Sequence, residues 1–280
     1  MKKYSFVIDV AKCENCNNCF LSCKDEHCGN EWPGYSLPQP LHGQRWMNIK
    51  RKERGKFPEI DVAYLPKPCM HCDDAPCIKA ARDGGVYKRE DGIVIIDPQK
   101  AKGQKAIVEA CPFGAIWWNE ETQIAQKCTF CAHLLDKGWK EPRCVQSCPT
   151  GALSIMYTEE EELPNIIRTD KLERLGGSNS SARPRCFYKN LYRYSKCFIS
   201  GSLASRDGIV SECVEGVIVK LLKDDLVVDE QKTDDFGDFK FDNLSTDSGI
   251  YCIEIKSEEG VEKKIDLKSG KSLSVGTIWI

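Results

Sequence analysis

The sequence predicts an α+β protein whose cysteine-rich first half precedes a last third of antiparallel strands. Two observations predict this class. Thirteen of the 17 cysteines lie before residue 150, many of them separated by two other residues, as in loops that bind metal through thiolates. From about residue 197 onward, apolar and polar residues alternate as in half-buried strands. A chain of 280 residues has room for one large domain or two ordinary ones.

The first half contains four cysteine runs that differ in completeness. They are Cys13, Cys16, Cys19 and Cys23; Cys69, Cys72 and Cys77, with Ala81 in the fourth place; Cys111 alone, preceded by Ala101, Gln104 and Ile107 at the earlier places; and Cys128, Cys131, Cys144 and Cys148. The first run has the C-x2-C-x2-C-x3-C spacing that ligates cubane iron–sulfur centres. Structural zinc rarely uses so tight a run, and disulfide scaffolds belong to much shorter chains.

An internal repeat indicates how these runs are organised. Cys111-Pro112 and Cys148-Pro149 are each followed, one residue later, by Gly-Ala. Such pairs end the halves of a two-cluster ferredoxin, so the repeat predicts two ferredoxin-like units in one domain. We therefore expect a tandem ferredoxin-like 4Fe–4S domain over 1–157, a linker that wraps back over 158–196, and a separate domain over 197–280.

The last domain is predicted to be a small antiparallel β-sandwich. Period-two alternation marks strands around Val217–Leu221, Phe239–Phe241 and Tyr251–Ile255, and turn signals between them allow about seven short strands. The segment Thr233–Leu244, followed by Gly249-Ile250-Tyr251, resembles the transthyretin-like or carboxypeptidase-regulatory-like module.

Composition narrows the possible functions. Forty basic against 42 acidic residues give a net charge of −2, so nucleic acid is not the expected partner. No apolar run approaches the roughly 20 residues of a membrane span. Because Met1–Ala11 lacks the apolar core of a signal peptide, we expect a cytoplasmic protein. The basic stretch Lys50–Arg54 predicts a solvated face, with partner docking as the alternative.

Other reactive residues form no recognisable site. No Ser/His/Asp arrangement is present, and His27, His42 and His133 lack the spacing of metal ligands. His71 lies between two cysteines of a complete set, so we expect it near the metal or at the surface without binding it. The cysteines outside the runs are expected to be buried and inert: Cys28, Cys186, Cys197, Cys213 and Cys252.

The four runs together resemble the iron–sulfur electron-transfer subunits of the molybdopterin oxidoreductases related to dimethyl sulfoxide reductase. In that family the first run pairs with the fourth, and the second with the third. The resemblance implies three 4Fe–4S clusters, held by Cys13, Cys16, Cys19 and Cys148; by Cys23, Cys128, Cys131 and Cys144; and by Cys69, Cys72, Cys77 and Cys111. A fourth cluster would need Ala81, Ala101, Gln104 and Ile107, none of which is a ligand.

Within this family, the chain resembles the small subunits of aromatic transhydroxylases. It shares with them the loss of one cluster and an added C-terminal sandwich. The segments Asn30–Tyr35, Arg45–Ile49, Arg89–Val94 and Lys189–Arg193 support the same resemblance, which extends over nearly the full chain. It implies a heterodimer with a large catalytic subunit that carries molybdenum on two pterin guanine dinucleotides. The complex would convert pyrogallol to phloroglucinol by hydroxyl transfer, and this chain would have no active site of its own. Two alternatives are the iron–sulfur subunit of a related molybdenum reductase, such as a catechol dehydroxylase, and a non-redox structural or assembly subunit.

Overall fold

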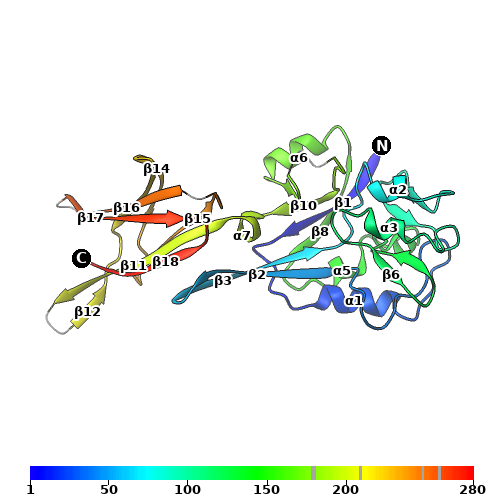
Figure 1. The fold of residues 1–280 in the computed structure, drawn as a ribbon, viewed down its shortest axis with the longest axis horizontal. Helices are drawn as coiled ribbons and strands as arrows, with labels where there is room; N and C mark the ends of the chain where they lie inside the picture. The colour runs from blue at the N-terminus through cyan, green and yellow to red at the C-terminus, as the bar shows by residue number, and fades with distance from the viewer. Residues whose placement is uncertain (178–180, 208–209, 248, 258–259) are drawn as a thin grey trace. The chain divides into compact units, whose positions relative to one another are not determined.

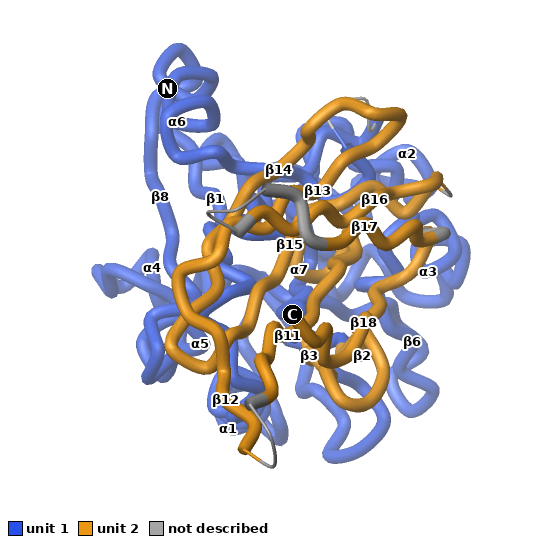
Figure 2. Tube along the Cα trace, turned by 90° about the vertical axis from the view of Figure 1, so that its left-hand side faces the viewer, with its two compact units in different colours: residues 1–50, 64–191 blue, residues 51–63, 192–280 orange. Residues whose placement is uncertain are grey.

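The chain forms two compact units. The structure, a computed structural model, describes residues 1–177, 181–207, 210–247, 249–257 and 260–280. Unit 1 contains Met1–Lys50 and Tyr64–Leu191, and unit 2 contains Arg51–Ala63 and Tyr192–Ile280 (Figure 2). Unit 2 therefore takes its residues from two separated stretches of the sequence.

Unit 1 is built from short helices and strands joined by long loops (Figure 1). In chain order its elements are β1 (Lys2–Asp9), α1 (Asn18–His27), α2 (Pro76–Ala80), β4 (Val86–Lys88), β5 (Val94–Ile96), α3 (Ala106–Glu109), β6 (Trp117–Asn119), β7 (Ile124–Gln126), α4 (Ala132–Leu135), α5 (Arg143–Gln146), β8 (Leu153–Glu159), α6 (Leu163–Thr169), β9 (Glu173–Arg174) and β10 (Cys186–Lys189). The strands β2 (Asn48–Lys56) and β3 (Glu59–Lys67) form a hairpin that runs from unit 1 into unit 2 and back.

A four-stranded sheet in the order β8-β1-β10-β9 organises unit 1. The strand β1 pairs antiparallel with β8 and parallel with β10, so Phe6 lies opposite Ile155 on one side and Cys186 on the other. Phe6 and Ile8, two residues apart on β1, are both buried, whereas Val7 between them is only partly buried, as the period of a strand predicts. The Phe6 ring packs on Phe130, with centroids 4.1 Å apart. This contact joins the sheet to a cysteine-containing loop.

Unit 2 consists almost entirely of strands, most of them antiparallel, as the sequence predicts. Its elements are α7 (Tyr192–Ser195), β11 (Cys197–Asp207), β12 (Val210–Cys213), β13 (Ile218–Lys223), β14 (Leu226–Lys232), β15 (Asp238–Leu244), β16 (Gly249–Ser257), β17 (Gly260–Ser269) and β18 (Leu273–Trp279). One sheet has the order β12-β11-β15 with β18 also on β11, and the other has the order β14-β13-β16-β17. The pair β11–β18 is parallel, which alternation alone does not reveal.

Both sheets of unit 2 contribute to one apolar core. Ile199, Phe241 and Ile278 come from the first sheet, and Val219 and Ile253 come from the second. All of them are nearly inaccessible to solvent. The period-two pattern of the sequence therefore identified inward-facing positions correctly, because residues two apart on a strand share a face.

The basic stretch around residue 50 is not a solvated face throughout. The side chain of Arg54 is only 1% exposed, and its Nη1 lies 2.8 Å from Oδ1 of Asp242. Its Nη2 pairs with Asp61, which also binds Arg193 at 2.8 Å. The expectation was wrong for Arg54 because its partner on β15 is distant in sequence.

Gly55, the next residue, has φ +87°, and a Cβ there would lie 2.7 Å from the ring of Phe198.

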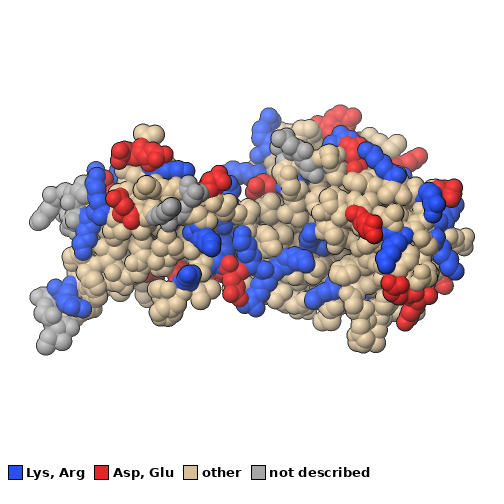
Figure 3. All heavy atoms as spheres, viewed as in Figure 1, with Lys and Arg blue, Asp and Glu red and all other residues tan. Residues whose placement is uncertain are grey.

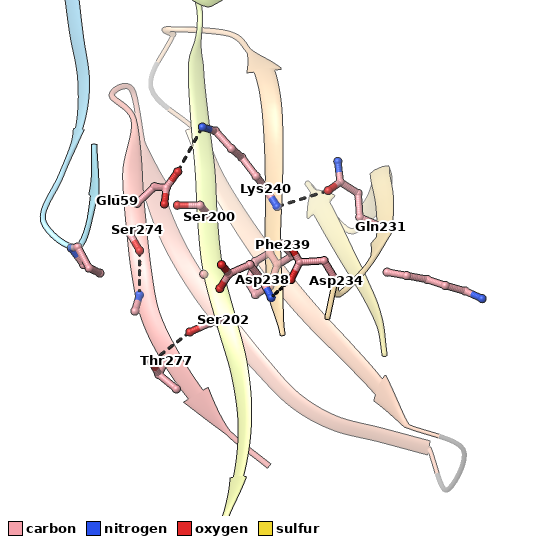
Figure 4. Close-up of a pocket in the computed structure, with 14 residues that line it drawn as sticks. Glu59, Ser200, Ser202, Gln231, Asp234, Asp238, Phe239, Lys240, Ser274 and Thr277 are labelled. Atoms are coloured by element: carbon pink, nitrogen blue, oxygen red, sulfur yellow. Dashed lines mark hydrogen bonds and ion pairs between the residues drawn. The ribbon is translucent and has the colours of Figure 1, made fainter. Parts of the chain in front are cut away.

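A groove of about 670 Å³ opens on unit 2 and is lined mainly by residues of β11, β14, β15 and β18 (Figure 4). Its lining is mostly polar and much of it is already paired. Lys240 forms an ion pair with Glu59 at 3.3 Å, and Ser202 bonds to Thr277 at 3.1 Å. We assign no chemistry to this groove.

Charges are mixed on the visible face of each unit, in keeping with the small net charge (Figure 3). Among the described residues, no helix is long and apolar enough to cross a membrane.

Candidate iron–sulfur centres

The cysteine loops of unit 1 share an unusual backbone conformation. Residues between or at the cysteines have positive φ, including Asn17 (62°), His71 (43°), Phe130 (59°) and Cys131 (49°). Left-handed residues turn successive N–H groups toward one side, where they bind anions. The N–H of His71 points at Sγ of Cys69 at 3.5 Å, and that of Phe130 points at Sγ of Cys128 at 3.4 Å. The loops therefore present hydrogen-bond donors to sulfur.

The structure brings together Cys13, Cys16, Cys19 and Cys148, here called quartet 1. Burial is the largest cause that raises the pKa of Cys19 to about 12, followed by the charges of Cys13, Cys148 and Cys16. Cys16 is exposed, whereas Cys19 is buried on α1. Quartet 1 thus extends from the interior to the surface.

Quartet 2 consists of Cys23, Cys128, Cys131 and Cys144, all of which are buried. Cys23 lies on α1 one turn after Cys19, and Cys144 lies on α5. Burial, and then the charges of Cys131, Cys128 and Cys23, hold the pKa of Cys144 well above its ordinary value. Four thiols from three separate segments therefore meet in the interior.

Quartet 3 consists of Cys69, Cys72, Cys77 and Cys111. All four line one cavity, whose remaining walls are mainly apolar and include Val94, Pro112 and Ile116. Burial raises the pKa of Cys72, and the charges of Cys69, Cys77 and Cys111 raise it further. The N–H of Ala115 approaches Sγ of Cys111 at 3.4 Å.

The three quartets adjoin one another in a fixed order. The charge of Cys19, in quartet 1, contributes to the raised pKa of Cys144 in quartet 2. Burial raises the pKa of Cys128 in quartet 2, and the charge of Cys69 in quartet 3 raises this pKa further. Quartet 2 therefore lies beside both of the others.

The positions that would supply ligands to a fourth cluster hold packed, non-ligating side chains. Ala101 and Ile107 are fully buried, and the amide of Gln104 is bonded on both sides. Its Oε1 accepts the N–H of Arg82 at 2.7 Å, and its Nε2 donates to the carbonyl of Lys100 at 2.7 Å. Ala81, the remaining position, ends α2. Gln104 thus joins two segments that a cluster would otherwise have joined.

Histidines near the quartets are buried and lie close to sulfur. His71 is 2% exposed, so it is not a surface residue, and its Nδ1 accepts the N–H of Val94 at 3.1 Å. Nε2 of His27 lies 4.0 Å from Sγ of Cys131. Burial, and then the charge of His133, lower the pKa of His27 to about 3. The spacing of the histidines in sequence gave no signal for the contact with Cys131.

The five remaining cysteines do not all match the expectation of burial. Cys186 and Cys197 are buried, Cys28 and Cys252 are half-buried, and Cys213 is exposed on β12. The expectation fails at Cys213 because β12 has exposed side chains throughout its length.

The donor atoms fit iron–sulfur clusters. Each quartet offers four thiols, the ligands that cubane clusters take, with backbone N–H groups aimed at sulfurs in quartets 2 and 3. Among the described residues, no three His, Cys, Asp or Glu side chains are grouped as a single metal ion would need. That criterion applies to a single ion, whereas a 4Fe–4S cluster spreads its four thiolate ligands around several metal atoms.

Comparisons with known proteins agree with this site. A family model described as a 4Fe–4S dicluster domain matches residues 60–158. The pyrogallol hydroxytransferase small subunit of Pelobacter acidigallici is 44% identical over 99% of both chains. One of the subunits of tetrathionate reductase from Salmonella typhimurium is 37% identical over 54% of this chain and 56% of its own length. The arsenate respiratory reductase iron–sulfur subunit of a Shewanella species is 27% identical over 66% of this chain and 95% of its own length.

The cysteine loops and these relatives define an iron–sulfur electron-transfer subunit of the molybdenum enzymes related to dimethyl sulfoxide reductase. More narrowly, the chain belongs to the family of the pyrogallol hydroxytransferase small subunit, which it matches along nearly its whole length. The resemblance found in the sequence is confirmed.

Proposed function

We propose that this chain binds three 4Fe–4S clusters and exchanges electrons with a large molybdopterin subunit in a heterodimer. The partner would convert pyrogallol to phloroglucinol by hydroxyl transfer, and this chain would contribute no catalytic residue. A relative named for pyrogallol hydroxytransferase, similar over 99% of this chain, supports the assignment of the reaction.

The observation that carries the proposal is the grouping of twelve cysteines into three sets of four. Each set combines residues distant in sequence, such as Cys19 with Cys148 and Cys72 with Cys111. No described cysteine occupies the fourth set of positions, where Gln104 is bonded instead. This grouping supports the twelve ligand assignments and a count of three clusters.

The order of the quartets supports a relay. A bound 4Fe–4S cluster supplies reversible one-electron transfer at a potential that its surroundings set. The helix α1 carries Cys19 of quartet 1 and Cys23 of quartet 2 one turn apart, so the same rigid element would hold both clusters. Quartets 2 and 3 are adjacent through Cys128 and Cys69, since, after burial, the charge of Cys69 raises the pKa of Cys128.

Quartet 1 is the best candidate for the end that meets the catalytic subunit. Cys16 is exposed, while every cysteine of quartet 2 is buried. Leu21, on the same helix as Cys19, is 58% exposed. A cluster with an accessible ligand is the one that a cofactor in the partner subunit could approach most closely.

Hydroxyl transfer between two aromatic rings has no net redox change, so the relay would set or restore the working oxidation state of molybdenum. The test is turnover of the purified complex with pyrogallol and a tetrahydroxybenzene, with no electron donor or acceptor. Phloroglucinol formation under these conditions is the expected result, and its absence would contradict the proposed reaction.

A second function is favoured by the other relatives, two of which are named as parts of reductases. In a reductase the relay brings electrons to the substrate. Loss of a hydroxyl group from catechol that requires a reduced donor would identify this alternative. A complex whose clusters cannot be reduced within a physiological range would instead indicate a structural role.

The domain plan of the sequence is retained as part of the proposal: ferredoxin-like units in 1–157, a wrapping segment in 158–196 and a sandwich in 197–280. The apolar core common to both sheets of unit 2 supports the last of these. A cytoplasmic location is proposed as well, since reduced thiols are needed for cluster binding.

A further inference from the structure

A buried lysine lies beside quartets 2 and 3. Lys127 follows β7 and directly precedes Cys128, a member of quartet 2, and it is only 2% exposed. Its Nζ donates to the carbonyl oxygen of Cys128 at 3.1 Å and to that of Val94. Val94 lines the cavity of quartet 3. The ammonium group is therefore fixed between the two quartets by backbone atoms.

The partners of Lys127 differ from those of the other deeply buried cations. Arg54 and Arg185 both bind carboxylates, Asp61 and Asp242 for the first and Asp73 and Glu160 for the second. In the part of the chain that the structure describes, Lys127 forms no ion pair, and its hydrogen-bond partners are neutral carbonyls. Burying an unpaired charge is costly, so an anion is expected nearby.

Cysteines of quartets 2 and 3 can become anionic and lie close to Lys127, which bonds to the backbone of Cys128 and of Val94 in the quartet 3 cavity wall. The positive charge of Lys127 lowers the pKa of Cys77 and Cys111 in quartet 3 and of Cys128 in quartet 2, although burial has the larger, opposite effect on each. The same charge acts on both quartets because the ammonium lies between them. Lys127 is not among the causes that shift the pKa of Cys13 or Cys19, the two quartet 1 cysteines with a shifted pKa.

We propose that Lys127 is a fixed cation that raises the reduction potentials of the clusters in quartets 2 and 3. The inference rests on the proposed presence of those clusters. A thiolate-bound cluster is anionic and gains a further negative charge on reduction. A cation held in a dry interior stabilises the more negative state more strongly than the less negative one. Lys127 therefore makes both clusters easier to reduce and leaves quartet 1 unaffected.

The test is a redox titration of the purified complex, followed by EPR, with iron content measured on the same samples. Lys127→Met removes the charge and the donor, and Lys127→Gln removes the charge while keeping a donor for the carbonyls. Lys102→Met, at an exposed lysine, is the matched control. Solvent screening makes its charge unimportant for buried groups.

Both neutral variants at Lys127 are expected to lower the potentials of two clusters and leave that of the third unchanged. The expected change in each reduction equilibrium is at least about tenfold, or about 59 mV for one electron. Unchanged potentials with full iron content would overturn the inference, as would an equal shift in Lys102→Met. Loss of clusters in both neutral variants would also overturn it, because the ammonium would then be needed for assembly. The iron content of the wild type tests separately whether the proposed clusters are present at all.

Discussion

Cys148 lies beside Cys19, although the two are separated by most of the cysteine-rich region. Its charge, after burial and the charge of Cys13, helps to raise the pKa of Cys19 to about 12. Thiols with such a high pKa stay protonated at neutral pH until a metal displaces the proton. The contact between these residues joins the first cysteine run to the last one, as the pairing rule of the family requires.

Removal of one ligand should remove one cluster only. Cys16→Ala is the best variant because Cys16 is exposed and contributes little to packing. We expect a loss of about four of about 12 iron atoms per chain. Cys28→Ala, which changes a cysteine outside the quartets, is the control and should keep all the iron. Equal iron content in the two variants would contradict the assignment of quartet 1.

Gln104 should stabilise the two segments that it joins, around Arg82 and Lys100. Gln104→Ala leaves the N–H of Arg82 and the carbonyl of Lys100 without their partner. An unsatisfied buried group costs about 1–3 kcal/mol, so hydrogen exchange around Arg82 should become faster. Gln99→Ala, at an exposed glutamine, should change the exchange very little. Unchanged exchange in Gln104→Ala would show that the amide does not hold these segments together.

The ion pairs of Arg54 should be important for unit 2. Arg54→Met leaves Asp61 and Asp242 without their buried partner, and breaking a buried pair in this way costs roughly 3–5 kcal/mol. Arg51→Met, on the same strand, breaks only an exposed pair with Glu53 and should cost about 1 kcal/mol or less. Hydrogen exchange of β11 and β15 measures both effects. Similar exchange rates in the two variants would mean that the buried ion pairs of Arg54 do not stabilise unit 2 more than an exposed pair does.

These residues show what the sequence could and could not predict. Three of the four cysteines in each quartet belong to one run, so the cysteine runs and the vacated positions were visible from spacing, whereas the distant fourth member came from the resemblance to the family. Strands with one buried face, such as that around Phe239 and Phe241, were equally visible because alternation has a fixed period. The burial of Arg54 and Lys127 was not predictable, since it depends on Asp242 and Val94, which are distant in sequence.

The carboxyl group of Asp61 should give unit 2 a measurable acid sensitivity. Burial favours a higher pKa for Asp61, but the hydrogen bond from Arg54 and the charges of Lys240 and Arg193 outweigh it and lower the pKa below 3.8. The unfolded chain then takes up this proton more readily than the folded one. The stabilisation is present above about pH 3.8 and is lost as the pH falls through the lower, folded value.

The thermal unfolding midpoint of the wild type should therefore fall more steeply on acidification, from about pH 5 to about pH 3, than that of Asp61→Asn. Both proteins carry the same cysteines, so any acid loss of clusters affects them equally. Parallel pH profiles would contradict the role given to Asp61.

The central claim is that twelve cysteines hold three clusters and that the fourth site is closed by protein. Iron and acid-labile sulfide content, measured with EPR on the purified complex, test it most directly after the contribution of the partner subunit is subtracted. Three clusters predict about 12 iron atoms in this chain. About 16 would mean that the positions around Gln104 hold a cluster through other ligands, and about 8 would contradict the grouping of Cys111 with Cys69, Cys72 and Cys77.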